Sequence, residues 1–396
     1  MKHRIVVLGA GYAGAVTAGR LAKRLHHDDV EITLVNGDPE FVERVRLHQL
    51  ASGQDLPRRP LRDLFEGTGV QVRPAWVTAV DADRKTVDLT TEQGAETLGY
   101  DTLVYALGST LADQGVPGVG EHAHDVAGKR GALRLRARLS ELEPGGTVLV
   151  AGGGLTGIET AAEIAEAHPG LAVAIATRGG VGDWLSDTAQ RHLRGVFDRL
   201  GITVHEGADI TRVEAGGVVT GTAGEIPAQV TVWTAGFTVH PIAAASTLEV
   251  SDTGRIVVDG TMRSVSHPDV YAVGDAAIAE GAGGKPLRMA CATANPMAWL
   301  AADALAARLT GRKVPGTTIG YALQCVSLGR RDAIVQRVTR DDRPTSTVIR
   351  GRTAARVKEF ICAATAWGIS HPTMMLPSSR RRLVATGVEE TRFAAG

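Results

Sequence analysis

The sequence has few cysteines, no excess of either charge and no long apolar run. Cys291, Cys325 and Cys362 share no close spacing, which excludes a disulfide scaffold or a CxxC pair and favours a reducing cytosol. Lys+Arg and Asp+Glu are equal at 43 each, so the basic excess of a dedicated nucleic-acid binder is missing. The longest apolar candidate, residues 297–309, contains Asp303 and Arg308 and falls short of the roughly 18 uninterrupted apolar residues that a membrane span needs. We expect a cytoplasmic chain without a membrane span, and leave open a peripheral contact at the inner face of a membrane.

Glycine is what the sequence has in excess. It supplies 48 of 396 residues, about 12% against a usual share of about 7%. The length predicts two to three domains at about 150 residues each. The apolar start at residues 5–18 resembles a signal peptide after its basic residues, but regularly placed glycines interrupt it. The same pattern recurs deep inside the chain, where no signal peptide can lie.

An internal duplication organises the first half of the chain. An apolar run over residues 5–8 precedes the motif GAGYAG (9–14), a helix to about residue 24 and a strand over residues 31–36. After 143 residues the pattern returns as a run over 148–151, GGGLTG (152–157), a helix to about 167 and a strand over 172–177. Continuous apolar runs of this kind are typical of strands buried on both faces of a parallel sheet.

The glycine spacing indicates dinucleotide binding. The first glycine permits a tight turn, the second lets the backbone approach a pyrophosphate, and the third lets helix and strand pack closely. The pyrophosphate then lies at the helix N-terminus, where free N–H groups favour negative charge. One such motif is often only a turn, but two with the same strand–helix context predict two bound dinucleotides.

Three further apolar strands end in small-residue turns. They cover residues 101–108, 230–236 and 270–275, and the third ends in Gly-Asp before a helical stretch at 289–309. Over residues 3–310 the chain resembles the two-dinucleotide flavoprotein reductases of the pyridine nucleotide–disulfide oxidoreductase superfamily, and within it the type II NADH:quinone dehydrogenases and their relatives. The remainder matches only loosely.

The resemblance implies that the first motif binds FAD and the second NAD(P)H. Gly9, Gly11 and Gly14 would contact the FAD pyrophosphate, Gly108 would lie at the crossing between domains, and Asp275 would bind the ribityl hydroxyls. The helix starting near residues 289–291 would point its N-terminal dipole at the flavin. The other positions that the resemblance assigns to the FAD site are Tyr12, Ala13, Asn36, Arg44, Val77, Ala106, Gly274 and Cys291. Those that it assigns to the NAD(P)H site are Gly152, Gly154, Thr156, Gly157, Thr177, Arg178 and Gly236.

The chain departs from the disulfide-reducing members. No cysteine precedes Cys291, so a dithiol relay is excluded and electrons must pass directly to a bound acceptor. Cys291 is the cysteine expected nearest the flavin, although an inert buried thiol is the simpler interpretation. Glu159 follows the second motif where the first copy has Val16, so the fold does not require an acid there. The resemblance implies that Glu159 reaches toward the nicotinamide; a helix-dipole acid is the alternative.

The acid that usually ends the second strand of each unit is missing. Asn36 stands in its place in the FAD half, with Asp38 close by. In the other half the strand ends in Thr177 and Arg178, which favours NADPH weakly, because no carboxylate would repel a 2′-phosphate. Arg178 as a solvated surface charge is the alternative.

Residues 44–49 (RVRLHQ) replace an apolar stretch of the relatives beside the flavin ring. This cationic segment could bind an anionic acceptor, or His48 could protonate reduced product near its ordinary pKa of about 6.5, apart from the hydride chemistry at Glu159. A surface helix with satisfied charges is the alternative.

Residues 316–396 are basic, with thirteen Lys+Arg against six Asp+Glu. Two strand-like runs at 322–329 and 332–338 precede a helix over about 354–369. Such a module could lie on anionic lipid, cover the flavin or form a homodimer, and a packed interface helix is the simplest of these.

We therefore predict an α/β fold with two Rossmann-like domains: an FAD domain (1–110 and 240–315), an NAD(P)H domain (111–239) and a small C-terminal α+β module (316–396). The predicted function is that of an FAD-dependent oxidoreductase, which passes a hydride from NAD(P)H to the flavin and then electrons to a quinone or quinone-like small-molecule acceptor. Two alternatives stay open: a flavin oxidoreductase for a specialised metabolite, and a reductase for a ferredoxin or monooxygenase partner.

Overall fold

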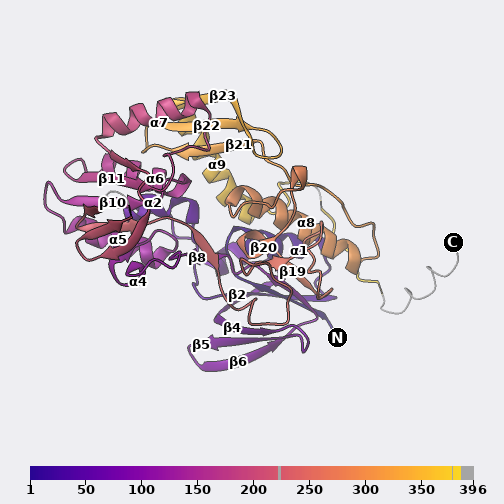
Figure 1. Ribbon diagram of the computed structural model, residues 1–396. Coiled ribbons are helices and arrows are strands. Elements are labelled where there is room, and N and C mark those ends of the chain that lie inside the picture. The colour runs from indigo at the N-terminus through magenta and orange to yellow at the C-terminus, as the bar shows by residue number, and fades with distance from the viewer. Residues whose placement is uncertain (222–223, 377, 385–396) are drawn as a thin grey trace.

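The computed structural model describes residues 1–221, 224–376 and 378–384. Two parallel five-stranded sheets form its two main cores and lie side by side (Figure 1). The first has the order β19-β7-β1-β2-β3, and the second β12-β11-β10-β16-β9. The strands of the first sheet are β19 (Val270–Ala272), β7 (Thr102–Tyr105), β1 (His3–Leu8), β2 (Val30–Asn36) and β3 (Val70–Pro74). Those of the second are β12 (Thr203–Glu206), β11 (Ala172–Thr177), β10 (Thr147–Ala151), β16 (Val230–Trp233) and β9 (Ala123–His124).

Each predicted strand–glycine–helix unit is present. Helix α1 (Tyr12–Arg24) connects β1 to β2, and α6 (Leu155–Ala167) connects β10 to β11, with parallel pairing in both units. Four residues of β1 are fully buried, as expected for a strand covered on both faces. The predicted α/β fold with two Rossmann-like units is confirmed.

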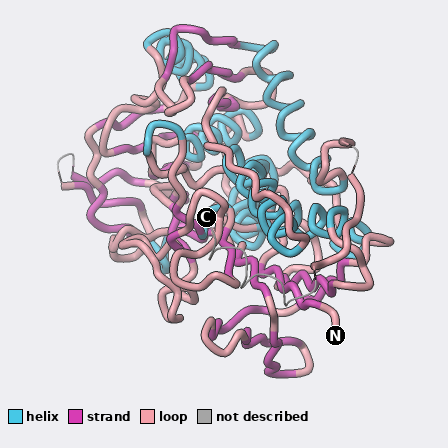
Figure 2. The backbone as a smooth tube through the Cα atoms, turned by 90° about the vertical axis from the view of Figure 1, so that its right-hand side faces the viewer, coloured by secondary structure: helices cyan, strands magenta, loops and turns pink. Residues whose placement is uncertain are grey.

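Helices cover both sheets and cluster in the middle of the molecule (Figure 2). Helix α8 packs along α1, and α2 lies against α5 and α6. The remaining helices and 3₁₀ turns are α2 (Leu47–Ala51), α3 (Leu61–Phe65), α4 (Val119–His122), α5 (Lys129–Ser140), α7 (Asp187–Leu200), α8 (Cys291–Leu309), α9 (Gly351–Ser370), η1 (Arg44–Arg46), η2 (Gly274–Ala276) and η3 (Ala282–Gly284).

Small sheets of two or three strands flank these cores, antiparallel except for the parallel pair of β18 and β20. The hairpins β4–β6 project at the foot of the molecule in Figure 1, and β8 pairs with β17 where the chain passes between the two main sheets. These strands are β4 (Trp76–Asp81), β5 (Thr86–Thr91), β6 (Gly94–Gly99), β8 (Ser109–Leu111), β13 (Ile210–Glu214), β14 (Gly217–Thr220), β15 (Gly224–Pro227), β17 (Phe237–Val239), β18 (Ile256–Val257) and β20 (Ala277–Ile278).

The C-terminal module contains the two predicted strands, one additional strand and the predicted helix. β21 (Leu323–Ser327), β22 (Ala333–Val338) and β23 (Pro344–Arg350) form an antiparallel sheet against α6 and α7, and α9 packs beneath it. Figure 1 shows this sheet at the top of the molecule, with α9 leading back toward α8. The predicted module also includes residue 377 and residues 385–396, which lie outside the described residues.

Candidate active site

The first glycine loop is shaped to admit a ligand at one position only. Gly9 has φ of +92°, and a Cβ there would overlap the Ala106 carbonyl. A Cβ at Gly14 would overlap the Gly9 carbonyl oxygen, whereas a Cβ at Gly11 would meet no protein atom within 4 Å. The outer two glycines thus serve packing, and Gly11 borders open space at the start of α1.

The second loop repeats this geometry. Gly152 has φ of +121°, and a Cβ at Gly157 would overlap the Gly152 carbonyl oxygen. Gly154 again borders open space. Thr156 lies in the first turn of α6, where its carbonyl accepts a hydrogen bond from Thr160 at 2.7 Å.

Among the described residues, neither helix N-terminus has a side-chain cap. Gly11 and Gly154 are the N-caps of α1 and α6, neither makes a side-chain cap bond, and neither helix has an acid in its first turn. Free N–H groups beside open space are the donors that a pyrophosphate needs. Both loops therefore fit a dinucleotide.

A polar cluster lies where the strands β7 and β19 end. Ser109 Oγ donates to Asp275 Oδ2 at 2.6 Å, and Arg44 Nη1 lies 3.7 Å from the same oxygen. Gly108 has φ of +71° and lies under the Arg44 guanidinium, while Gly274 has φ of +70° and packs against Ala13. The structure thus brings together Arg44, Gly108 and Asp275 beside the first loop, and it adds Ser109, which the sequence did not single out.

Asn36, Tyr12 and Val77 differ in what they offer a ligand. Asn36 Oδ1 accepts from the Ala10 N–H at 2.8 Å, so this side chain already holds the first loop. Tyr12 is buried against Phe41, and its hydroxyl has no hydrogen-bond partner among the described residues. Val77 lies on β4 and packs on the core of the first sheet. The unpartnered Tyr12 hydroxyl leaves a polar atom for a bound group.

Glu159 is the centre of a buried network that joins three parts of the chain. Its Oε1 accepts from the Ser327 N–H at 2.9 Å and lies 3.0 Å from Lys358 Nζ. Its Oε2 lies 3.9 Å from His48 Nδ1. His48 and Glu159 are each about 5% exposed. The expectation that they act in separate places is therefore wrong.

Burial sets the charges of this network. Desolvation lowers the pKa of His48 to about 4, against the attraction of Glu159, so His48 is neutral near pH 7 and its expected titration near 6.5 is wrong. Burial by itself would raise the pKa of Glu159. Several favourable interactions, of which the attraction of the Lys358 ammonium is the largest, outweigh burial and hold this pKa below its usual value. The Glu159 carboxylate in turn raises the pKa of Lys358, although burial opposes it. The network thus holds a carboxylate–ammonium pair.

The segment 44–49 is mostly buried, so the alternative of a surface helix is wrong in its location, although the charge of Arg46 is paired as that alternative expected. Arg46, His48 and Gln49 are all buried. Arg46 binds Glu43 at 3.0 Å and Glu359 of α9 at 2.6 Å. The C-terminal helix is therefore fastened to this segment through Arg46 and to α6 through Lys358. The sequence did not single out Lys358. The one feature that could have indicated it is a lysine within the predicted helix 354–369, among apolar residues.

Cys291 begins α8 and has exposed surface. Desolvation by the surrounding protein raises the pKa of its thiol, and Lys358, Glu159 and Asp275 all act on it electrostatically. The Glu159 network and the Asp275 cluster therefore both lie within electrostatic range of the start of α8.

Thr177 and Arg178 follow β11 beside the second loop. Thr177 lies directly against Gly153. Arg178 is 80% exposed, and its Nε binds Asp209 Oδ1 at 2.9 Å. Gly236 lies at the end of the β16 segment with φ of +149°, against Gln114. Asp209 is an acid near the strand end that the sequence analysis missed.

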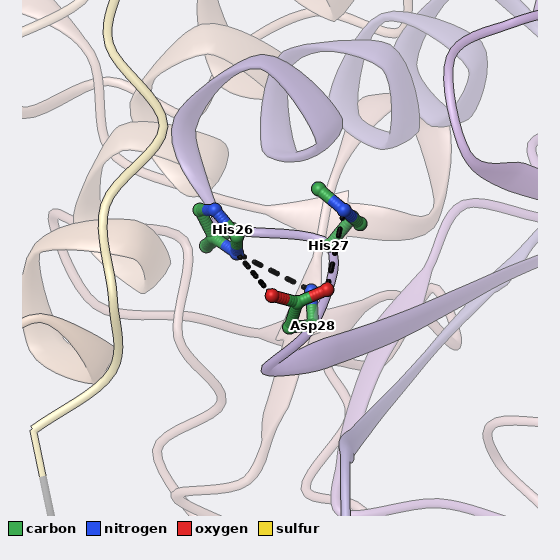
Figure 3. Close-up of side chains that lie close together, drawn as sticks. All are labelled: His26, His27 and Asp28. Carbon is green, nitrogen blue, oxygen red and sulfur yellow. Dashed lines mark hydrogen bonds and ion pairs between the residues drawn. The ribbon is translucent and has the colours of Figure 1, made fainter.

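One cluster of potential metal ligands lies elsewhere, on the turn between α1 and β2 (Figure 3). The ligand atoms of His26, His27 and Asp28 lie within 4.8 Å of one another. Asp28 Oδ2 also lies 3.0 Å from Arg382 Nη2, so a guanidinium already balances this carboxylate. The cluster fastens the end of the described chain to the turn.

No helix in the described ranges combines the length and the apolar composition that crossing a membrane requires.

Comparisons with known proteins agree with this architecture. The pattern of the family described as "Pyridine nucleotide-disulphide oxidoreductase" matches residues 3–304. An NADH dehydrogenase-like protein of Mycobacterium tuberculosis is 32% identical over 319 residues, which cover 74% of this chain and 78% of the relative. Demethylphylloquinone reductase NdbB of Synechocystis is 28% identical over 78% of this chain and 81% of its own. The structure of NDH2 from Plasmodium falciparum in complex with NADH superposes with a TM-score of 0.78 at 14% identity, covering 94% of this chain and 97% of that one.

Proposed function

Because this chain belongs to the pyridine nucleotide-disulphide oxidoreductase family, we propose that it is an FAD-dependent NAD(P)H:quinone oxidoreductase. The observation that carries the proposal is the pair of glycine loops that lie open at Gly11 and Gly154, with Glu159, the partner of Lys358, two residues after the second motif. The names of the relatives, among them a demethylphylloquinone reductase, support a quinone as acceptor.

The first half of the site would hold FAD. Free N–H groups at the start of α1 would bind the pyrophosphate, and Asp275 and Ser109 would bind ribityl hydroxyls. When bound, FAD accepts a hydride from the nicotinamide and passes the electrons on. An FAD domain of residues 1–110 and 240–315 is supported by the strands of the first sheet, all of which come from these ranges.

The second half would hold the nicotinamide dinucleotide in a domain of residues 111–239, which supplies every strand of the second sheet. The start of α6 would bind its pyrophosphate, with Thr156 and Gly236 nearby. We propose NADPH as the preferred donor because no acid ends β11 and Arg178 follows it. Asp209 limits that preference, because it already pairs with Arg178.

The reaction balances as NAD(P)H + H⁺ + quinone → NAD(P)⁺ + quinol. Two electrons reach the acceptor with two protons, one of which enters from solvent. Lys358 is charged and lines a cavity that opens at the surface, so its ammonium can donate a hydrogen bond to an acceptor oxygen. Glu159 positions this ammonium. Neutral His48 supports Glu159 rather than serving as an imidazolium acid.

An acceptor panel tests the proposal. Purified protein that contains FAD is mixed with NAD(P)H and then with menadione, with an oxidised ferredoxin, or with neither. Fast turnover with menadione is expected. Turnover with ferredoxin but not with menadione would show that the acceptor is a protein and not a quinone. Reduction by NAD(P)H with turnover on neither would favour the specialised-metabolite alternative.

A further inference from the structure

Among the described residues, three of the four arginines that line the cavity beside Lys358 have no acidic partner. We propose, on the basis of the quinone reductase function above, that the acceptor is an acidic quinone, bearing a carboxylate or sulfonate, whose anionic group binds Arg331, Arg352 and Arg356.

The cavity connects the surface to the Glu159 network. Its volume is about 360 Å³, and the buried residues Gln49, Ser327 and Cys362 line it together with Lys358. Lys358 and Ser327 are the residues that bind Glu159. A molecule in this cavity therefore reaches the network at one end and the exposed arginines at the other.

The acids of the cavity wall are already neutralised. Glu359 binds Arg46 at 2.6 Å and Arg330 at 2.9 Å. Asp332 binds His192 at 2.7 Å and Arg199 at 2.8 Å. These carboxylates therefore leave the other arginines of the wall without a counter-charge.

Three arginines of the wall stay unpaired. Within the part of the chain that the structure describes, the guanidinium groups of Arg331, Arg352 and Arg356 make no ion pair or side-chain hydrogen bond. Arg352 and Arg356 are four residues apart on α9, where like charges repel. Such a group of unpaired guanidiniums is suited to bind two oxygens of a carboxylate or a sulfonate in two-pronged geometry.

The same wall is poorly suited to a long isoprenoid tail. Beyond Lys358 it offers Ala355 and Cys362 but otherwise mostly charged or polar side chains. An apolar tail would gain little burial there and would desolvate the guanidiniums. A compact acidic quinone satisfies both ends of the cavity.

The test compares two naphthoquinones that differ in charge: 1,4-naphthoquinone-2-sulfonate and menadione. Holoenzyme is measured as the wild type, as Arg352→Gln/Arg356→Gln, and as the charge-matched control Arg312→Gln/Arg337→Gln, whose residues lie outside the cavity. The ratio of kcat/KM for sulfonate over menadione should fall at least 10-fold in the cavity variant and stay unchanged in the control. Calorimetric binding of the sulfonate to oxidised protein should weaken in parallel.

Equal ratios in all three proteins, with unchanged binding, would overturn the inference while leaving quinone reduction intact. If the cavity variant instead loses only binding to vesicles that contain phosphatidylglycerol, the arginines face lipid and the inference also fails. If neither quinone is reduced although NAD(P)H reduces the flavin, the proposed function itself fails.

Discussion

The role that the sequence suggests for Glu159 differs from the role that its contact with Lys358 indicates. From the sequence, Glu159 is an acid after a glycine motif, and its alternative role is to complement a helix dipole. In the structure it binds the ammonium of a lysine that lies 199 positions later in the chain, at 3.0 Å, and the side chains of Lys358 and Glu159 are 15% and 5% exposed. A pairing of this kind could not be predicted from the sequence, because it depends on how the C-terminal helix folds back over α6.

A double-mutant cycle measures this pair. Glu159→Gln and Lys358→Met should each lower the free energy of unfolding by about 3 kcal/mol or more, because each leaves a buried charge without its partner. The double variant should lose clearly less than the sum of the two. Urea denaturation of the three variants gives the coupling; strictly additive losses would show that the two charges do not interact.

Asp209 bears on the choice of nicotinamide dinucleotide. Arg178→Ala should lower the preference for NADPH over NADH roughly 10-fold, because it removes a phosphate partner. Asp209→Asn should raise that preference by freeing the guanidinium. The measurement is kcat/KM for both dinucleotides, and a wild-type enzyme that prefers NADH would contradict the assignment.

Glu163 should make stability depend on pH. Burial raises the pKa of this carboxyl to about 7, from an ordinary value of 4.5. Since the folded state then holds a proton that the unfolded state has released, stability falls as pH rises between these two values. Glu163→Gln should therefore increase the free energy of unfolding above pH 7, by up to about 3 kcal/mol, and have little effect near pH 4.5. Denaturation curves measured between pH 4.5 and a pH above 7 check this prediction, with Glu121→Gln, at an exposed position, as the control. If the free energy of unfolding depends on pH in the same way for the wild type and for Glu163→Gln, the prediction is refuted.

At the scale of the elements, periodicity and glycine spacing predicted the long buried units well. The strand expected over 172–177 is β11 itself, and both glycine-motif helices end where the sequence indicated. The hairpins β4–β6 and the strand β23 were not predicted. Most residues of β4, β6 and β23 are exposed or half-buried, so no apolar run marks these strands, and their pairing is set by neighbouring strands.

In each loop, substitution by alanine should have different effects at the glycine that borders open space and at the glycine that packs against the backbone. Gly154→Ala introduces a methyl group into open space, so the protein should fold with a change in stability below about 1 kcal/mol, yet bind NAD(P)H at least 10-fold more weakly. Gly157→Ala meets the Gly152 carbonyl and should cost about 1–3 kcal/mol or more. In the first loop, Gly11→Ala should likewise weaken FAD binding with little effect on stability, and Gly14→Ala should lower stability.

Thermal unfolding and ligand titration separate the two effects. A Gly154→Ala protein that binds NAD(P)H like the wild type would mean that the dinucleotide does not approach this loop.

At the scale of the whole molecule, the C-terminal module contributes side chains to the candidate active site. Its helix α9 supplies Lys358 to Glu159 and Glu359 to Arg46, and its arginines line the cavity that leads inward. The sequence predicted a basic module with a packed helix, but the partners of its charges come from residues 43–49 and 159. Contacts between such distant segments follow from the assembled fold and from no local pattern.

The central claim is that one chain carries reducing equivalents from NAD(P)H to a quinone through FAD. The most direct measurement is an anaerobic titration of the purified protein, followed by its flavin absorbance. The account predicts one FAD per chain, bleached by one equivalent of NAD(P)H and restored by one equivalent of quinone. A chain that binds no flavin, or a bound flavin that NAD(P)H leaves oxidised, would contradict it.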